Sequence, residues 1–197
     1  MIALVRHGQS TSNAQGLVVG RGDPHLTLLG ERQARALAPW LTGATQVWTS
    51  PLLRARETAA LAMPELVALV RDSFVELDYG SFEGALAATA PGEGWRALEL
   101  RHDQAFGGGE SLAELDARVH HELDALLGDP TSLLYSPSEH LAIVSHVSPI
   151  KSAVAWALGV PGTVAWRMRL ENGSLTLVGA RNGTPRLIRY NAVPTLA

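Results

Sequence analysis

Short apolar segments and longer stretches with helical spacing alternate along the chain. The short segments are rich in branched residues and predict strands, because such side chains pack well on a pleated sheet. Residues 72–76 and two later stretches alternate apolar and polar residues, as strands with one covered face do. The predicted strands are residues 2–5, 45–49, 72–76, 140–145, 174–179 and 185–190.

The longer stretches predict helices between these strands, and those at residues 26–42 and 111–127 are amphipathic. Thr27 is an N-cap candidate for the first helix, and Ser111 with Glu114 has capping-box spacing for the third. The second and fourth helices begin at Ser-Pro pairs, in which serine caps the helix and proline occupies its first turn. The predicted helices are residues 26–42, 51–63, 111–127 and 148–158.

Strands that alternate with helices predict an α/β fold. We expect a three-layer α/β sandwich with a mostly parallel central sheet. The 197 residues suit one domain with a sizeable core, and no repeat or linker divides them, so we interpret residues 1–197 as a single domain. Residues 77–109 are the least regular part, and the glycines at 107–109 mark a loop.

Composition narrows the classes of function. A net charge of -3 gives no basic field, so no nucleic-acid partner is expected. No apolar stretch approaches the roughly 20 residues that span a bilayer, and Arg6 interrupts the N-terminal apolar run. We therefore expect no membrane partner, no signal peptide and a cytoplasmic protein. The absence of cysteine excludes disulfides, thiolate metal sites and cysteine nucleophiles.

Motifs for several other chemistries are absent from the sequence. The chain has no HExxH pair, no acidic calcium loop, no phosphate-binding GxxxxGK[ST] loop and no GxSxG elbow. We therefore expect no metal and no cofactor.

Polar side chains stand at the ends of the predicted strands. Arg6 and His7 follow the first strand and Arg54 the second, whereas Glu76 ends the third and His146 follows the fourth. In an open α/β sheet, ligands bind in the crevice outside the carboxyl ends of the strands. We expect these side chains to share that crevice.

This set of side chains suits a phosphoryl group. Two arginines and two histidines would surround a dianion, because guanidinium groups bind phosphate oxygens bidentately. A neutral imidazole whose tautomer is fixed is a competent nucleophile, and His7 is the candidate. Glu76 would protonate the leaving oxygen and then take a proton from water.

The same residues also have plain structural interpretations. Arg54 could be a solvated helix residue, and Glu76, near Asp78 and Glu83, could be a surface carboxylate. His146 could be a core histidine that bonds to the backbone. Taken one by one, the residues leave these alternatives open.

Together the motifs resemble the histidine phosphatase superfamily, the phosphoglycerate mutase-like proteins, over most of the chain and in the family's order. The segment LVRHGQS with Asn13 resembles the nucleophile motif, and residues 144–146 resemble the segment of the second histidine. Ser10, Phe82 and Val147 depart from the residues that are common in the family, and none of these departures changes a charged group. The other matching segments are residues 23–34, 50–59, 76–84 and 108–111.

The resemblance implies a phosphoglycerate mutase-like fold without a metal, and it implies roles for individual residues. His7 is implied as the phosphorylated residue and Glu76 as the proton donor. The run from Ser145 to Lys151 is similar to the branch that holds α-ribazole phosphatase-like and acid phosphatase domains. The implied catalytic residues are His7, Glu76, Arg6, Arg54 and His146, and the implied substrate-binding residues are Arg6, Asn13, Arg54, His146 and Val147.

We therefore expect a metal-independent phosphatase that hydrolyses a small phosphomonoester through a phosphohistidine on His7. Residues 84–109 are expected to form a lid, a small phosphorylated metabolite is the expected partner, and a homodimer is possible. The alternative is a phosphoglycerate mutase-like phosphotransferase, although a short chain without room for large insertions favours hydrolysis. A third class is a catalytically silent module that binds a phosphorylated ligand.

Overall fold

The computed structural model of the chain describes residues 1–88, 102–165 and 167–196. In this part of the chain a six-stranded sheet has the order β3-β2-β4-β1-β5-β6. Strands β3, β2, β4 and β1 are parallel, whereas β5 runs antiparallel to β1 and β6 runs antiparallel to β5. The strands are β1 Ile2–Arg6, β2 Ala44–Thr49, β3 Ala68–Val70, β4 His140–Ser145, β5 Leu175–Arg181 and β6 Thr184–Ala192.

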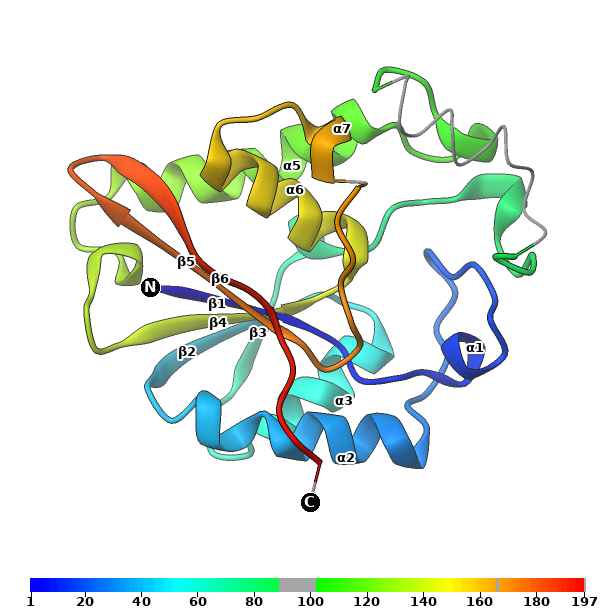
Figure 1. Cartoon of the computed structure of the whole chain (residues 1–197), viewed down its shortest axis with the longest axis horizontal. Helices are drawn as coiled ribbons and strands as arrows, with labels where there is room; N and C mark the ends of the chain where they lie inside the picture. Colours follow the sequence, from blue (N-terminus) through cyan, green and yellow to red (C-terminus); the bar gives the residue numbers. More distant parts are fainter. Residues whose placement is uncertain (89–101, 166, 197) are drawn as a thin grey trace.

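Helices cover both faces of the sheet, which gives three layers (Figure 1). Helices α2 and α3 pack on one face, and α5 and α6 pack on the other. The helices are α1 Thr11–Ala14, α2 Leu28–Ala36, α3 Leu53–Ala62, α5 Leu112–Gly128, α6 Val147–Leu158 and α7 Gly162–Ala165. The expected three-layer α/β sandwich with a mostly parallel sheet is confirmed.

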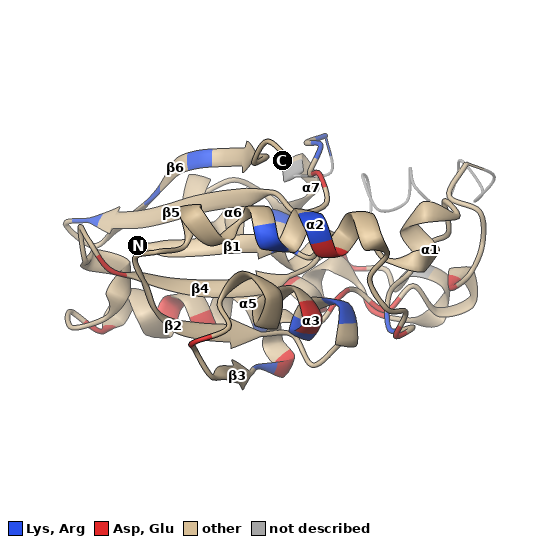
Figure 2. Ribbon diagram, turned by 90° about the horizontal axis from the view of Figure 1, so that it is seen from below, with Lys and Arg blue, Asp and Glu red and all other residues tan. Residues whose placement is uncertain are grey.

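The middle strands are buried on both faces. Ile2 and Leu4 of β1 pack in the core beneath α5 and α6, whereas Ala3 and Val5 pack in the core against α2 and α3. A strand that is covered on both sides needs a continuous apolar run, and this is the pattern of the β1 segment. Figure 2 shows that the central strands carry few charged residues, which gather instead on helices, loops and the outer strand β6.

The predicted strand at residues 72–76 is wrong. Asp72–Phe74 forms a 3-10 turn, and the strand at this edge of the sheet is Ala68–Val70, which pairs with β2. Phe74 and Val75 are buried in a turn rather than in a strand. A buried turn and a half-buried strand can show the same short alternation of apolar residues, and the pattern does not separate them.

The ends of the predicted helices shift by a few residues. Helix α3 begins at Leu53 rather than at Pro51, and α2 ends at Ala36. The chain after α2 continues as a 3-10 turn at residues 38–40, because Pro39 lacks the amide hydrogen that an α-helix would need. The predictions for α5 and α6 agree with the structure within one residue at each end.

Candidate active site

The carboxyl ends of β1 and β4 bring Arg6, His7 and His146 together. The two strands are parallel neighbours with Arg6 opposite Ser145, so the residues that follow them emerge side by side. The ring centroids of His7 and His146 lie 5.0 Å apart. Arg54, in the first turn of α3, donates its Nε–H to His7 Nε2 at 3.2 Å. The structure thus places these predicted residues in one cluster.

His7 is held as one tautomer. The residue is 3% exposed, and its Nδ1 lies 2.7 Å from the carbonyl oxygen of Gly8, which can only accept a hydrogen bond. Nδ1 therefore carries the hydrogen, and the lone pair of Nε2 accepts from Arg54. Burial, together with the positive charges of Arg54 and Arg6, lowers the pKa of His7 well below 6.5. The imidazole is neutral at neutral pH, with its nucleophilic lone pair on Nε2.

His146 is oriented by Ser50. Its Nε2 lies 2.7 Å from Ser50 Oγ, which already accepts the amide of Leu52 and can donate its own hydrogen to His146. The proton of a neutral His146 then lies on Nδ1. Burial and the charge of Arg54 lower the pKa of His146 well below 6.5, which keeps this ring neutral as well.

Backbone carbonyl groups fix the two arginines. Arg54 is 1% exposed and donates to the carbonyl oxygens of Gly22 at 2.7 Å and Gly20 at 2.9 Å. Arg6 donates to the carbonyl oxygen of Leu170 at 2.5 Å. Burial lowers the pKa of both arginines, that of Arg6 to about 10, and both remain charged at neutral pH.

Two donors beside His7 are available to a bound anion. Among the described side chains, Arg6 Nε and His146 Nδ1 are buried and have no hydrogen-bond partner. Buried polar atoms ordinarily have such a partner. Both groups border His7, and no hydrogen-bond partner from the described part of the chain reaches either nitrogen.

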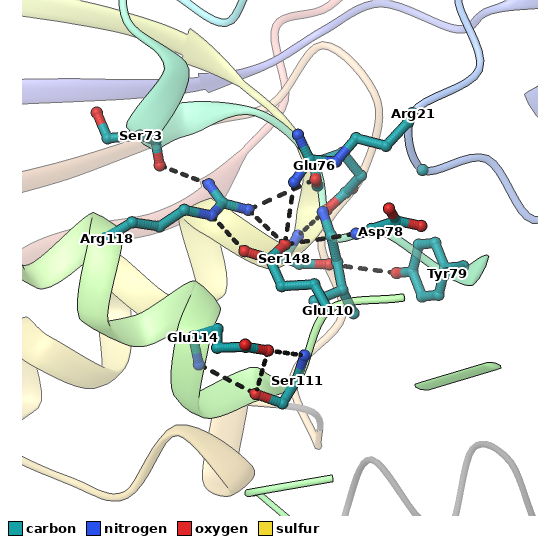
Figure 3. Close-up of polar contacts among 12 residues, drawn as sticks. Arg21, Ser73, Glu76, Asp78, Tyr79, Glu110, Ser111, Glu114, Arg118 and Ser148 are labelled. Carbon is teal, nitrogen blue, oxygen red and sulfur yellow. Dashed lines mark hydrogen bonds and ion pairs between the residues drawn. The ribbon is translucent and has the colours of Figure 1, made fainter. Parts of the chain in front are cut away.

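Glu76 lies at the N-terminus of α6. It is 4% exposed, and its carboxylate accepts the amides of Leu77 at 2.8 Å, Val147 at 3.1 Å and Ser148 at 3.2 Å. The last two belong to the first helical turn, where amides have no partner within the helix. The hydroxyl of Tyr79 lies 3.2 Å from Ser148 Oγ beside this group (Figure 3). The carboxylate is therefore fixed against the start of α6.

A cavity of about 240 Å³ borders Arg6, His7 and Glu76, whereas Arg54 and His146, also predicted to bind substrate, lie next to His7 and are not among its lining residues. Asn13 and Val147, both predicted to bind substrate, line it together with His7 and Glu76. The volume is below the roughly 300–1,000 Å³ typical of pockets for drug-sized ligands, so it suits a small molecule. The lining residues are Arg6, His7, Asn13, Leu17, Val18, Val19, Glu76, Tyr79, Ala87 and Val147.

The short helix α1, which no apolar pattern predicts, positions Asn13. Ser10 caps this helix, and Asn13 Oδ1 accepts the amide of Ser10 at 3.1 Å in return. The same oxygen accepts from Asn172 Nδ2 at 3.2 Å. The side-chain NH₂ group of Asn13 is therefore the part that it can offer to a ligand.

Several parts of the site carry no sequence signal of their own. The pattern identifies Ser50 only as a helix cap, although it orients His146. The wall at residues 17–19 is paired with the chain near residue 85, where Val18 donates to the carbonyl of Ala85 at 2.8 Å. Such loop contacts follow no period, so spacing along the chain does not show them. Tyr79 lies within a family motif, and this was the available signal for it.

The predicted lid at residues 84–109 is described only in part, because residues 89–101 lie outside the described ranges. Residues 84–87 border the cavity through Ala87 and through hydrogen bonds to residues 16–18. The lid as a whole stays a prediction.

Within the described residues, no three or more histidine, cysteine, aspartate or glutamate side chains come together as a group that could hold a metal ion. In the same part of the chain, no helix combines the length and apolar character that crossing a membrane requires. The positive charges next to His7 come from Arg54 and Arg6.

The family comparison agrees with this arrangement of side chains. The model of the histidine phosphatase superfamily (branch 1) matches residues 2–193. The chain belongs to the histidine phosphatase superfamily. The match covers the elements from β1 to β6, so it includes every strand end that contributes to the candidate active site.

Two curated relatives of this histidine phosphatase superfamily member differ in how much of their length they share with it. A bifunctional protein of Mycobacterium tuberculosis is 35% identical over 185 residues, which are 89% of this chain and 49% of that protein. The chain thus spans about half the length of this relative. A probable phosphoglycerate mutase of Cronobacter sakazakii is 33% identical over 190 residues, with 90% of this chain and 83% of the relative covered.

A solved structure shares the fold of this superfamily member. It is that of a mycobacterial glucosyl-3-phosphoglycerate phosphatase, with a TM-score of 0.85, 25% identity and 98% of both chains covered. The phosphoglycerate mutase-like fold that the motifs imply is confirmed.

Proposed function

We propose that the protein is a metal-independent phosphatase that hydrolyses a small phosphomonoester through a phosphohistidine on His7. The state of His7 supports this most directly. Its imidazole is buried and neutral, Nδ1 bonds to a carbonyl oxygen, and Nε2 lies beside a permanently charged arginine. Phosphoryl transfer depends mainly on positioning and on stabilising the charge of the equatorial oxygens, and Arg6 and Arg54 supply that charge.

In the first step, His7 Nε2 attacks phosphorus, so that an N–P bond forms and the P–O bond to the leaving group breaks. As the ester binds, a phosphoryl oxygen beside Nε2 accepts the Nε–H of Arg54 in place of the imidazole, while the carbonyl groups of Gly20 and Gly22 keep the guanidinium fixed. Arg6 Nε and His146 Nδ1 donate to the other oxygens. Glu76 gives its proton to the leaving oxygen, which departs as an alcohol. Glu76 Oε2 can carry that proton, since it accepts one amide whereas Oε1 accepts two.

In the second step, water attacks the phosphorus of the phosphohistidine. Glu76, now a carboxylate, takes a proton from the water, and the N–P bond breaks with its electron pair returning to Nε2. Inorganic phosphate leaves, and both His7 and Glu76 regain their starting protonation states. The proposed partner is a small phosphorylated metabolite, whose leaving group would lie against the apolar wall of Leu17, Val18 and Val19.

The second candidate is a phosphoglycerate mutase-like phosphotransferase, which the relatedness to a probable phosphoglycerate mutase favours. In that reaction a second acceptor, rather than water, would take the phosphoryl group from His7. The homodimer and the cytoplasmic location stay predictions.

The test is turnover of p-nitrophenyl phosphate and of a panel of phosphorylated metabolites by the purified chain, with a chelator present. We expect turnover by the native sequence and a loss of at least about 10³-fold in His7→Ala, because the nucleophile is removed. Mass spectrometry of enzyme quenched at alkaline pH should find one phosphoryl group on the peptide that contains His7. His121→Ala, an exposed histidine of α5, is the matched control and should keep full activity.

Each contrary result would indicate a different function or mechanism for this protein. Unchanged turnover in His7→Ala would remove the phosphohistidine from the reaction. Loss of turnover in the chelator would indicate a metal enzyme, and transfer to an added alcohol in preference to water would indicate the phosphotransferase. Binding of phosphoesters without turnover would indicate a silent module.

A further inference from the structure

The ion pair of Glu110 and Arg118 lies beside the segment that carries Glu76 (Figure 3). Arg118, on α5, donates its Nε–H to Glu110 Oε1 at 2.6 Å and an NH2 hydrogen to Oε2 at 2.9 Å. The side chains are only 20% and 12% exposed. A bidentate pair of this kind has a fixed geometry, unlike an exposed ion pair between flexible side chains.

The remaining donors of Arg118 hold the backbone around Glu76. One NH1 hydrogen is donated to the carbonyl oxygen of Ser73 at 2.6 Å, and NH2 makes a longer contact of 3.5 Å with the carbonyl oxygen of Glu76 itself. The guanidinium group thus contacts the chain within the 3-10 turn that follows β3, at Ser73, and again at Glu76. It makes these contacts on the backbone and leaves the Glu76 side chain to the amides of α6.

Glu110 extends this support to the arginine side of the site. Its Oε2 accepts from the amide of Asp78 at 3.4 Å and from Arg21 NH2 at 3.3 Å. Arg21 lies between Gly20 and Gly22, whose carbonyl oxygens hold Arg54. One carboxylate therefore connects the segment that carries Glu76 with the loop that orients Arg54.

We propose that Glu110 and Arg118 are positioning residues that hold Glu76 within reach of the leaving oxygen. The proposal rests on the proposed function, in which Glu76 protonates that oxygen. General acid catalysis needs the proton donor at hydrogen-bond distance in the transition state, and a displacement of about 1 Å can cost roughly 10²-fold in rate. Neither residue lines the cavity, so both act through the backbone that they hold.

The test compares leaving groups in single turnovers, which isolate phosphorylation of His7 from the later attack by water. p-Nitrophenolate leaves without needing a proton, whereas an alkoxide needs one from Glu76. In Arg118→Met, phosphorylation by an alkyl phosphate should slow by about 10- to 100-fold. Phosphorylation by p-nitrophenyl phosphate should slow less than about threefold, with KM for both substrates within about twofold of the native value.

Three further variants make the test decisive. Glu110→Gln keeps the size of the side chain, weakens the same ion pair and should show the same selective loss. It replaces Arg118→Met in the test if that variant folds poorly. In a Glu76→Gln background, Arg118→Met should cause no additional loss with the alkyl substrate, because the group that it positions is already gone. Arg35→Met removes an exposed arginine of α2 and should leave both rates unchanged.

Equal losses with both leaving groups, or losses that multiply in the double variant, would show that the ion pair acts only on folding and would overturn this proposal alone. A native protein that forms no phosphohistidine would overturn the proposed function together with it.

Discussion

At the scale of single residues, Arg54 donates hydrogen bonds to partners that lie far from it in the sequence. Its Nε–H meets His7, and its two NH₂ groups meet the carbonyl oxygens of Gly22 and Gly20. A planar guanidinium can do this because its donors point in fixed directions on two sides. A lysine ammonium has the same charge but is a compact point, so it could not hold these partners at once.

Arg54→Lys should therefore reduce kcat/KM by about 10- to 150-fold, which corresponds to losing one charge-assisted hydrogen bond of roughly 1.5–3 kcal/mol. Steady-state kinetics with the best substrate of the panel measures this. The matched control is Arg56→Lys, an exposed arginine two residues farther along α3, which should change kcat/KM less than twofold. Native kcat/KM in Arg54→Lys would show that charge alone suffices at this position.

At the scale of elements, two glycines allow the loop after β1 to pass against α2. A Cβ atom at Gly30 would lie 2.1 Å from the carbonyl oxygen of Gln9, and one at Gly8 would lie 2.2 Å from the carbonyl oxygen of Gly30. These are contacts with backbone, which cannot turn away as a flexible side chain would. The carbonyl of Gly8 also fixes the tautomer of His7, so the packing of α2 bears directly on the proposed nucleophile.

Gly30→Ala should destabilise the protein by about 1–3 kcal/mol, the usual cost of overpacking. It should also lower kcat, because the loop that carries His7 must shift. Urea unfolding and kinetics measure the two effects. Gly128→Ala, at the open C-terminal end of α5, meets no atom within 4 Å. This control should leave kcat unchanged and leave stability unchanged or raise it by up to about 1 kcal/mol. Native stability and kcat in Gly30→Ala would contradict the packing argument.

At the scale of the whole molecule, two neutral histidines buried beside charged arginines make stability depend on pH. Burial and Arg54 lower the pKa values of His7 and His146 well below 6.5. In the unfolded chain both imidazoles titrate near about 6.5. Below that pH the unfolded state binds protons that the folded state does not, so acidification favours unfolding. Above it, both states are neutral and these residues contribute no pH dependence.

The free energy of unfolding should therefore fall as the pH drops below about 6.5, by up to about 1.4 kcal/mol per pH unit for each of the two imidazoles. In His146→Asn the slope of unfolding free energy against pH should be shallower by the contribution of one imidazole, up to about 1.4 kcal/mol per pH unit. Urea unfolding between pH 7.5 and pH 5 measures the slopes. His121→Asn, which changes an exposed histidine, should keep the native slope. An unchanged slope in His146→Asn would show that folding does not lower the pKa of His146.

Much of the fold can be predicted from the sequence, because burial on a repeating face leaves a period in the chain. Helix α5 shows this period, and the β1 and β4 segments show the continuous apolar runs of strands that are covered on both faces. These elements and α6 agree with the structure within one residue. The strand Ala68–Val70 is missed because an edge strand with Leu69 and Val70 about half exposed leaves little apolar pattern. The segment at residues 72–76 imitates a strand because Phe74 and Val75 form an apolar run too short to show any period, although both are buried in a turn and not in the sheet.

The residues of the candidate site also differ in whether the sequence predicts them. Residues at strand ends, such as His7 and His146, can be found from the sequence, since a strand ends where its apolar run ends. The residues that hold these histidines and line the cavity cannot be found in this way. Ser50, Arg118 and the wall near Val18 contact the site from positions far from it in the sequence. The roles of all these residues await the experiments above.

By itself, the sequence determined where the four longer helices and most of the strands lie, and that Arg6, His7 and His146 stand at strand ends. Periodicity, capping and turn preferences depend on neighbours along the chain, so they can be recognised from the sequence alone. Only the tertiary structure decided that β4 pairs with β1, which of the two nitrogens of His7 carries the hydrogen, and that its pKa is low. Desolvation and the fields of nearby charges depend on distances through space, and folding sets those distances.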